Sequence, residues 1–138
     1  MRVPLCITIE IQTMINKHIL VIEDNYEIRE VVSWVLEDEG FKVSVIAHQP
    51  ADSLFDFKAD LIVLDEWINA QEGHMFCREI KAIQSLKHVP VVIFSTAMDI
   101  ELLVETCGAD GFVRKPFDIT ALVTEIKRLL APSPIATY

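Results

Sequence analysis

Acidic side chains follow two short apolar runs of the sequence, and a lysine follows a third. Glu23 and Asp24 come directly after the first run, Asp65 ends the second, and Lys115 follows the third. If each run is a strand of a parallel sheet, the three ends meet at one edge, where open α/β sheets bind ligands. Carboxylates crowded at that edge repel one another, so a hard cation with oxygen ligands, such as Mg²⁺, is the natural occupant.

Hydroxyl groups follow a further apolar run. Ser95 and Thr96 come after it, so one of their hydroxyls is placed to donate a hydrogen bond at the same edge. A phosphoryl oxygen is a suitable acceptor, and the Lys115 ammonium would supply positive charge beside it. Carboxylate, cation, hydroxyl and ammonium together indicate chemistry on a phosphoryl group.

Composition sets limits on the class of protein. The chain has 138 residues, enough for one domain, with 12 basic and 21 acidic residues and a net charge of −9. That charge repels a phosphate backbone and predicts no direct nucleic-acid partner. No apolar run approaches the roughly 18 residues of a membrane span. Three widely spaced cysteines, Cys6, Cys77 and Cys107, fit a reducing compartment, and the N-terminus lacks a signal-peptide pattern, so we expect a cytoplasmic protein.

The elements that would position these groups alternate along the chain. Short apolar or alternating runs predict buried strands, and apolar residues at helical spacing predict the helices between them. The predicted strands are residues 19–22, 41–45, 61–64, 89–94 and 111–114. The first predicted helix begins at an Asp24–Glu27 capping box and ends at Gly40, and a short second helix lies within residues 50–57. The third begins at Gly73 and carries Phe76, Ile80 and Ile83. A two-turn helix then runs from Asp99 to Gly108, and the last helix runs from Asp118 to the residue before Pro132.

This alternation predicts an α/β fold, a doubly wound five-stranded parallel sheet with helices on both faces. Residues 17–130 would form the domain. Residues 1–16 are an N-terminal extension of unknown order, and residues 131–138 are a tail too short and proline-broken to act as an effector.

The chain resembles the receiver domain of bacterial two-component response regulators. The resemblance is carried by residues 19–25, by residues 61–65 with Gly73 eight positions after Asp65, by Ser95-Thr96-Ala97 and by residues 108–117. It implies a flavodoxin-like fold with strand order 2-1-3-4-5. It also implies a stand-alone phosphoacceptor switch that is not an enzyme beyond its own phosphorylation and dephosphorylation.

The resemblance implies a role for each candidate site residue. Asp65 would take a phosphoryl group from the phosphohistidine of a sensor histidine kinase or a histidine phosphotransfer protein. Asp24, Asp65 and the backbone carbonyl of Trp67 would hold Mg²⁺, with Glu23 acting directly or through water. The metal and Lys115 would neutralise the charge of the moving phosphoryl group.

Signalling would depend on a switch pair, Thr96 and Phe112. The resemblance implies that Thr96 moves toward the phosphoryl oxygen and that the Phe112 ring turns into the space it leaves. A cis Lys115–Pro116 bond is also implied. The fourth helix, fifth strand and fifth helix would form the face that controls a downstream effector protein, and a homodimer would use the same face.

The sequence departs from the family pattern close to Asp65. Asn69 stands where many receivers have proline, and the stretch from Thr96 to Gly108 is short by about one helical turn. Glu66 adds a carboxylate beside Asp65. That carboxylate would either raise the cost of receiving a phosphoryl group or tighten cation binding, and the sequence favours neither.

Ordinary interpretations remain open for single residues. Asp24 alone reads as a helix cap, Lys115 as a solvated lysine and Phe112 as simple packing; only their order along the chain favours a shared site. The main alternative is a receiver-like interaction module that acts without phosphorylation. A nucleotide-binding enzyme is disfavoured because the chain lacks a glycine-rich phosphate loop.

Overall fold

A five-stranded parallel sheet forms the centre of the computed structural model, which describes residues 16–68, 71–95, 100–114 and 119–131. The strand order is β2-β1-β3-β6-β7, which confirms the predicted 2-1-3-4-5 order when the sheet's strands are counted along the chain. The strands are β1 (His18–Ile22), β2 (Lys42–Ile46), β3 (Leu61–Asp65), β6 (Val91–Ser95) and β7 (Gly111–Arg114).

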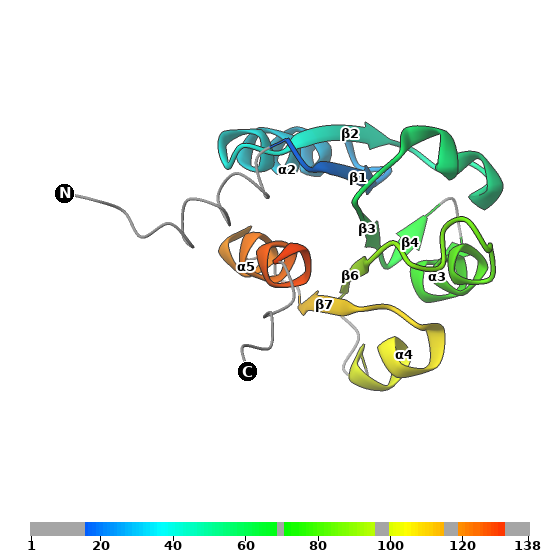
Figure 1. Ribbon diagram of the computed structural model, residues 1–138. Helices are drawn as coiled ribbons and strands as arrows, with labels where there is room; N and C mark the ends of the chain where they lie inside the picture. Colours follow the sequence, from blue (N-terminus) through cyan, green and yellow to red (C-terminus); the bar gives the residue numbers. More distant parts are fainter. Residues whose placement is uncertain (1–15, 69–70, 96–99, 115–118, 132–138) are drawn as a thin grey trace, which may run out of the picture.

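Helices cover both faces of this sheet (Figure 1). The helices α2 (Tyr26–Asp38) and α5 (Ile119–Leu130) lie on one side. On the other side lie α3 (Gly73–Lys81), α4 (Ile100–Cys107) and the 3-10 helix η1 (Ala51–Phe57). This is the predicted doubly wound arrangement.

Two hydrophobic clusters fill the space between the sheet and its helices. Alternate residues of a strand point to opposite faces, so Ile19 and Val21 join the cluster under α2 and α5, while Leu20 and Ile22 join the cluster under α3. Both faces are buried, which explains why the central strands read as unbroken apolar runs. Burying each large aliphatic side chain contributes roughly 1.5–3 kcal/mol, so the sheet edges are fixed by a rigid core.

The start of α2 differs from the prediction. Asn25, and not Asp24, is the N-cap: its Oδ1 accepts hydrogen bonds from the backbone N–H groups of Glu27 at 2.9 Å and Ile28 at 3.2 Å. Asn25 takes this role because it is the extended residue directly before the helix. The Asp24 carboxylate is therefore not used as the cap, and Asp24 is exposed.

Two other elements differ from the prediction. Residues 51–57 form a 3-10 helix that buries Leu54, and Lys58 ends it in the left-handed region at φ 52°. The expected loop after β3 contains an antiparallel ribbon of β4 (Trp67–Ile68) and β5 (Gln71–Glu72). Strands β2 and β6 also begin one and two residues later than predicted.

In the second half of the chain, α4 agrees with the prediction where the structure describes it, whereas α3 ends at Lys81, so Ile83 packs against the core from beyond the helix. The short α4 buries Ile100 and Cys107 and is followed by Gly108 at φ 82°. Cys77 and Cys107 are buried, as expected for small apolar residues, and a hydrogen bond with Cys107 together with burial raises the pKa of the Cys77 thiol above its usual range. Asp99, Asp118 and Cys6 lie outside the described residues. Of the helices that are described, none has the length and apolar character to cross a bilayer.

Candidate functional site

Two buried carboxylates lie at neighbouring positions on the carboxyl edge of the sheet. Ile22 pairs with Leu64 across β1 and β3, so the next residues on each strand are Glu23 and Asp65. Glu23 is 1% exposed and Asp65 is 8% exposed. Burying a carboxylate costs free energy unless a cation or hydrogen-bond donors compensate it, so this pair marks the edge as a site and not simply as a strand end.

Glu23 also shapes the loop that leads into α2. Its Oε1 accepts a hydrogen bond from the backbone N–H of Asn25 at 2.9 Å, while its own backbone N–H donates to the Ile46 carbonyl at 3.0 Å. Asp24 lies between the anchored Glu23 and the capping Asn25. The loop is therefore fixed on both sides of an exposed carboxylate.

The main chain at Asp65 is in close contact with the start of α3. The Gly73 N–H donates to the Glu66 carbonyl at 2.7 Å. A Cβ atom added to Gly73 would lie 2.0 Å from the Asp65 carbonyl oxygen, which no side chain tolerates. Only glycine allows this approach, so Gly73 is a positioning residue whose physical role the sequence pattern alone did not reveal.

A hydroxyl reaches the same edge from β6. Phe94 pairs with Asp65, and Ser95 follows as the last residue of the strand. Ser95 is 3% exposed, and its Oγ donates to Glu66 Oε2 at 2.8 Å. The sequence had placed a hydroxyl here, but the contact with Glu66 was not foreseen. The one feature that could have indicated this contact is that Glu66 and Ser95 directly follow Asp65 and Phe94, which pair in the sheet.

Several predicted site residues lie outside the described part of the chain: Thr96, Lys115 and Pro116, together with the Lys115–Pro116 bond. The backbone of Trp67, the predicted source of a carbonyl ligand, pairs with Glu72 in the antiparallel ribbon after β3.

Phe112 is partly buried and packs against the cluster under α3 and α4, and the Arg114 guanidinium lies 5.6 Å from its ring centroid. This packing fits both the switch role and the plain packing role.

The donor atoms at this edge fit a hard cation, but not in the predicted way. Within the described residues, no three His, Cys, Asp or Glu side chains converge as a metal site, so the expected crowding of three carboxylates is not found. Glu23 and Asp65 are buried side by side, whereas Asp24 is exposed. Mg²⁺ commonly binds through one or two protein carboxylates and keeps several waters, and this donor set suits that mode.

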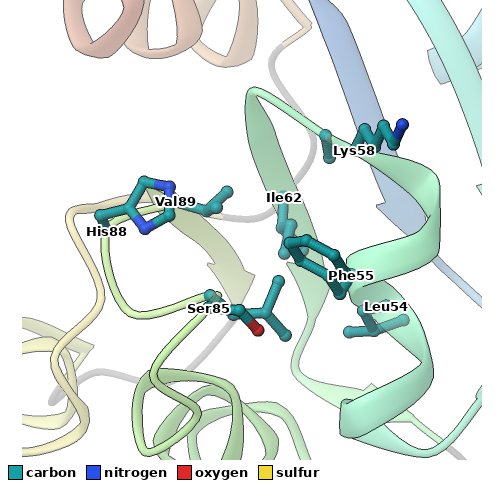
Figure 2. Close-up of a pocket in the computed structure, with 9 residues that line it drawn as sticks. Leu54, Phe55, Lys58, Ile62, Ser85, His88 and Val89 are labelled. Carbon is teal, nitrogen blue, oxygen red and sulfur yellow. The ribbon is translucent and has the colours of Figure 1, made fainter.

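A cavity of about 230 Å³ lies at the other edge of the sheet and does not belong to this site. Figure 2 shows its lining from η1, from the start of β3 and from the segment before β6. Ile62, near the amino end of β3, lines the cavity, whereas Asp65 ends that strand. This cavity is therefore separate from the candidate site at the carboxyl edge.

Comparison with known proteins identifies the class that this fold and site define. The family model described as the response regulator receiver domain matches residues 19–127. The chain belongs to this family, the receiver domains of two-component systems. These are signalling domains that interact with histidine kinases, and phosphorylation and Mg²⁺ binding are typical of them.

Relatives show both the similarity and its extent. The chain is 34% identical over 119 residues to the transcriptional regulatory protein CseB of Streptomyces coelicolor, covering 82% of this chain and 49% of the relative. It is 29% identical over 117 residues to the DNA-binding response regulator MtrA of Mycobacterium tuberculosis, covering 83% and 51%. The chain thus spans about half the length of the curated relatives that it matches.

A solved structure supports the fold. The receiver domain of a sensor histidine kinase from Pseudomonas aeruginosa, solved with magnesium coordinated in its active-site cleft, matches with a TM-score of 0.73 at 24% identity, covering 83% of this chain and 98% of that one. Because relatives of this chain carry names that refer to DNA binding and transcription, the expectation of no nucleic-acid partner is not supported.

Proposed function

We propose that the chain is a phosphoacceptor switch of a two-component phosphorelay, with Asp65 as the acceptor. The donor is the phosphohistidine of a sensor histidine kinase or a histidine phosphotransfer protein. The observation that carries the proposal is the burial of Asp65 beside Glu23 at the carboxyl edge, in a family whose members are phosphorylated. The close approach of Gly73 holds the Asp65 main chain in place, so the carboxylate is aimed by the fold.

The transfer needs little covalent work from the protein. An Asp65 carboxylate oxygen forms a bond to phosphorus while the phosphorus–nitrogen bond of the phosphohistidine breaks. The electron pair of that bond returns to the imidazole, and the product is an acyl phosphate on Asp65. The fold aligns the acceptor, and burial at the edge limits the access of water to it.

The residues suited to hold the cation are Asp65, Asp24 and the Trp67 backbone carbonyl, with Glu23 acting directly or through water. When bound, Mg²⁺ supplies charge neutralisation for the phosphoryl oxygens. Lys115 supplies a second positive charge in this proposal.

The hydroxyl that contacts the phosphoryl oxygen comes from the end of β6. Thr96 remains our proposed switch residue with Phe112, and we extend the donor role to Ser95, because Ser95 is buried directly after the sheet partner of Asp65. The signal would leave through α4, β7 and α5 to a downstream effector or a second copy of the chain. Phosphorylation shifts this equilibrium only by its preference for the active arrangement.

The test is the intact mass after incubation with acetyl phosphate and Mg²⁺. We expect one phosphoryl adduct on the wild type, dependent on Mg²⁺, and none on Asp65→Asn. Asp56→Asn, which removes an exposed carboxyl group from η1, is the matched control and should be labelled as the wild type is. A folded wild type without adduct at saturating Mg²⁺ overturns the proposal.

One observation favours a second candidate, a receiver-like interaction module that acts without phosphorylation. The Ser95 hydroxyl already has a carboxylate acceptor in Glu66, so part of the site is satisfied without a phosphoryl group. The same mass measurement separates the two, because such a module, folded and with saturating Mg²⁺, would gain no phosphoryl adduct.

A further inference from the structure

We propose that Glu66 competes with the phosphoryl group for the Ser95 hydroxyl: its carboxylate accepts that hydroxyl's hydrogen bond in the unphosphorylated protein and must release it when Asp65 is phosphorylated. The inference rests on the proposed function and adds a positioning residue to it. Its consequence is that Glu66 slows the uptake of a phosphoryl group by Asp65.

The sheet register places the two residues next to the acceptor. Asp65 on β3 pairs with Phe94 on β6, and the contact joins the residue after each of them. The Ser95 Oγ donates to Glu66 Oε2 at 2.8 Å, from a side chain that is 3% exposed. A hydrogen bond from a buried hydroxyl to a carboxylate is among the stronger ones in proteins, so breaking it opposes phosphorylation.

The backbone of Glu66 is held in place by α3. Its carbonyl accepts the Gly73 N–H at 2.7 Å, and Gly73 packs so closely that a Cβ atom would be 3.3 Å from the Glu66 Cα. The Glu66 side chain therefore leaves from a fixed point between β3 and α3. Its reach to Ser95 is a property of the fold.

Two effects of Glu66 act in the same direction. A phosphoryl oxygen on Asp65 would have to replace Glu66 Oε2 as the acceptor of the Ser95 hydroxyl. The Glu66 carboxylate also places negative charge one residue from the acceptor, which repels an incoming phosphoryl group. The sequence left open whether Glu66 hinders phosphorylation or helps to bind the cation, and its orientation toward Ser95 points to hindrance.

The experiment measures the rate of adduct formation with acetyl phosphate at saturating Mg²⁺. Glu66→Gln keeps an acceptor oxygen without the charge, and Glu66→Ala removes both. We expect Glu66→Ala to be labelled roughly tenfold faster than the wild type and Glu66→Gln to fall between them. Glu30→Gln, on the exposed side of α2, is the matched charge control and should leave the rate unchanged.

Ser95→Ala separates competition from repulsion. If Glu66 acts by holding the hydroxyl, Glu66→Ala should raise the labelling rate much less in a protein that also carries Ser95→Ala than in the wild type. A gain of the same size in both backgrounds would overturn the competition. Without any phosphoryl donor, the Ser95 amide resonance should shift in Glu66→Ala relative to the wild type, whereas an unchanged resonance would overturn the contact.

The remaining outcomes distinguish this inference from the proposed function. A wild type that is labelled at Asp65, with both Glu66 variants labelled at the same rate or more slowly, overturns the role of Glu66 and leaves Asp65 as the acceptor. A complete absence of labelling in the wild type and all variants overturns both.

Discussion

The two edges of the central sheet both carry acidic side chains but use them differently. At the amino edge, Asp60 Oδ2 accepts the His18 backbone N–H at 2.8 Å, with Lys17 Nζ 4.0 Å from its other oxygen. Asp110 Oδ2 accepts the Val91 backbone N–H at 2.9 Å and a hydrogen bond from Lys81 Nζ at 2.8 Å. Each of these carboxylates ties the beginning of a strand to a neighbouring segment and a lysine.

At the carboxyl edge, the acids lie in the site that we propose for phosphorylation. Glu23 and Asp65 are more deeply buried than Asp60 and Asp110, and they lie at adjacent strand ends. The comparison teaches that acids beside strands can differ in role, and that burial, hydrogen-bond partners and the edge on which they lie distinguish them. Changes at the amino edge should therefore alter stability alone, and changes at the carboxyl edge should also alter phosphorylation.

The largest effect is expected for Gly73→Ala. The new Cβ would meet the Asp65 carbonyl oxygen at 2.0 Å, and backbone on both sides must move. We expect a loss of about 3 kcal/mol in the free energy of unfolding, measured in urea, and much slower labelling by acetyl phosphate because the acceptor is displaced.

Gly108→Ala is the matched control for this change. Gly108 has a φ of 82°, but its nearest contact for a Cβ is the Lys81 side chain at 3.5 Å. The expected cost is about 1 kcal/mol from the left-handed backbone, with labelling unchanged. If Gly73→Ala were no worse than Gly108→Ala in both measurements, the close packing at Asp65 would have no functional meaning.

A smaller effect, on stability alone, is expected for Asp110→Ala. The change leaves the Val91 N–H and the Lys81 ammonium, which is 15% exposed, without their carboxylate partner. We expect a loss of about 2 kcal/mol in the free energy of unfolding and no change in the labelling rate. Asp110→Asn, which keeps an acceptor oxygen, should lose less. A large fall in the labelling rate of a stable, folded Asp110→Ala would contradict the claim that changes at the amino edge alter stability alone.

The sequence predicts the fold well because the fold depends on local patterns. The runs at β1, β3 and β6 are buried on both faces, so their apolar character is continuous and readable. The α2 stripe and the glycines at positive φ are equally local. The misassigned helix start shows the limit: Asp24 and Asn25 are both good caps, and only the backbone decides that Asn25 takes the role.

The site is predicted only in part because its contacts are not local. The rule that strand ends share an edge places Glu23 beside Asp65, which the register confirms. The Ser95–Glu66 contact spans 29 residues, and the Lys81–Asp110 contact at the other edge spans the same number. No spacing rule relates residues so far apart. In the sequence, Asp65 differs from Asp110 only by standing after and not before an apolar run, and the partners that each acid contacts are brought to it by the fold.

The smallest effect is expected for an exposed ion pair between the end of β7 and the start of α4. The Arg114 guanidinium donates to the Glu101 carboxylate and links β7 to α4, with both side chains exposed. This hydrogen bond lowers the pKa of Glu101 below its usual range. A carboxyl group whose pKa is lower in the folded protein contributes stability above its unfolded pKa, and that contribution is lost as the pH falls through the folded value.

Glu101→Gln should therefore destabilise the protein slightly at pH 7, by far less than Asp110→Ala, because water screens an exposed pair. The difference from the wild type, measured by urea unfolding, should shrink as the pH falls below about 4 and also when salt is added. Glu105→Gln, on the same helix, should show neither trend. A difference that grew on acidification would mean that Arg114 does not stabilise the ionised form of Glu101. If the expected trend holds, the exposed pair gives the baseline against which the Lys81–Asp110 pair can be measured, because the Lys81 side chain of that pair is only 15% exposed.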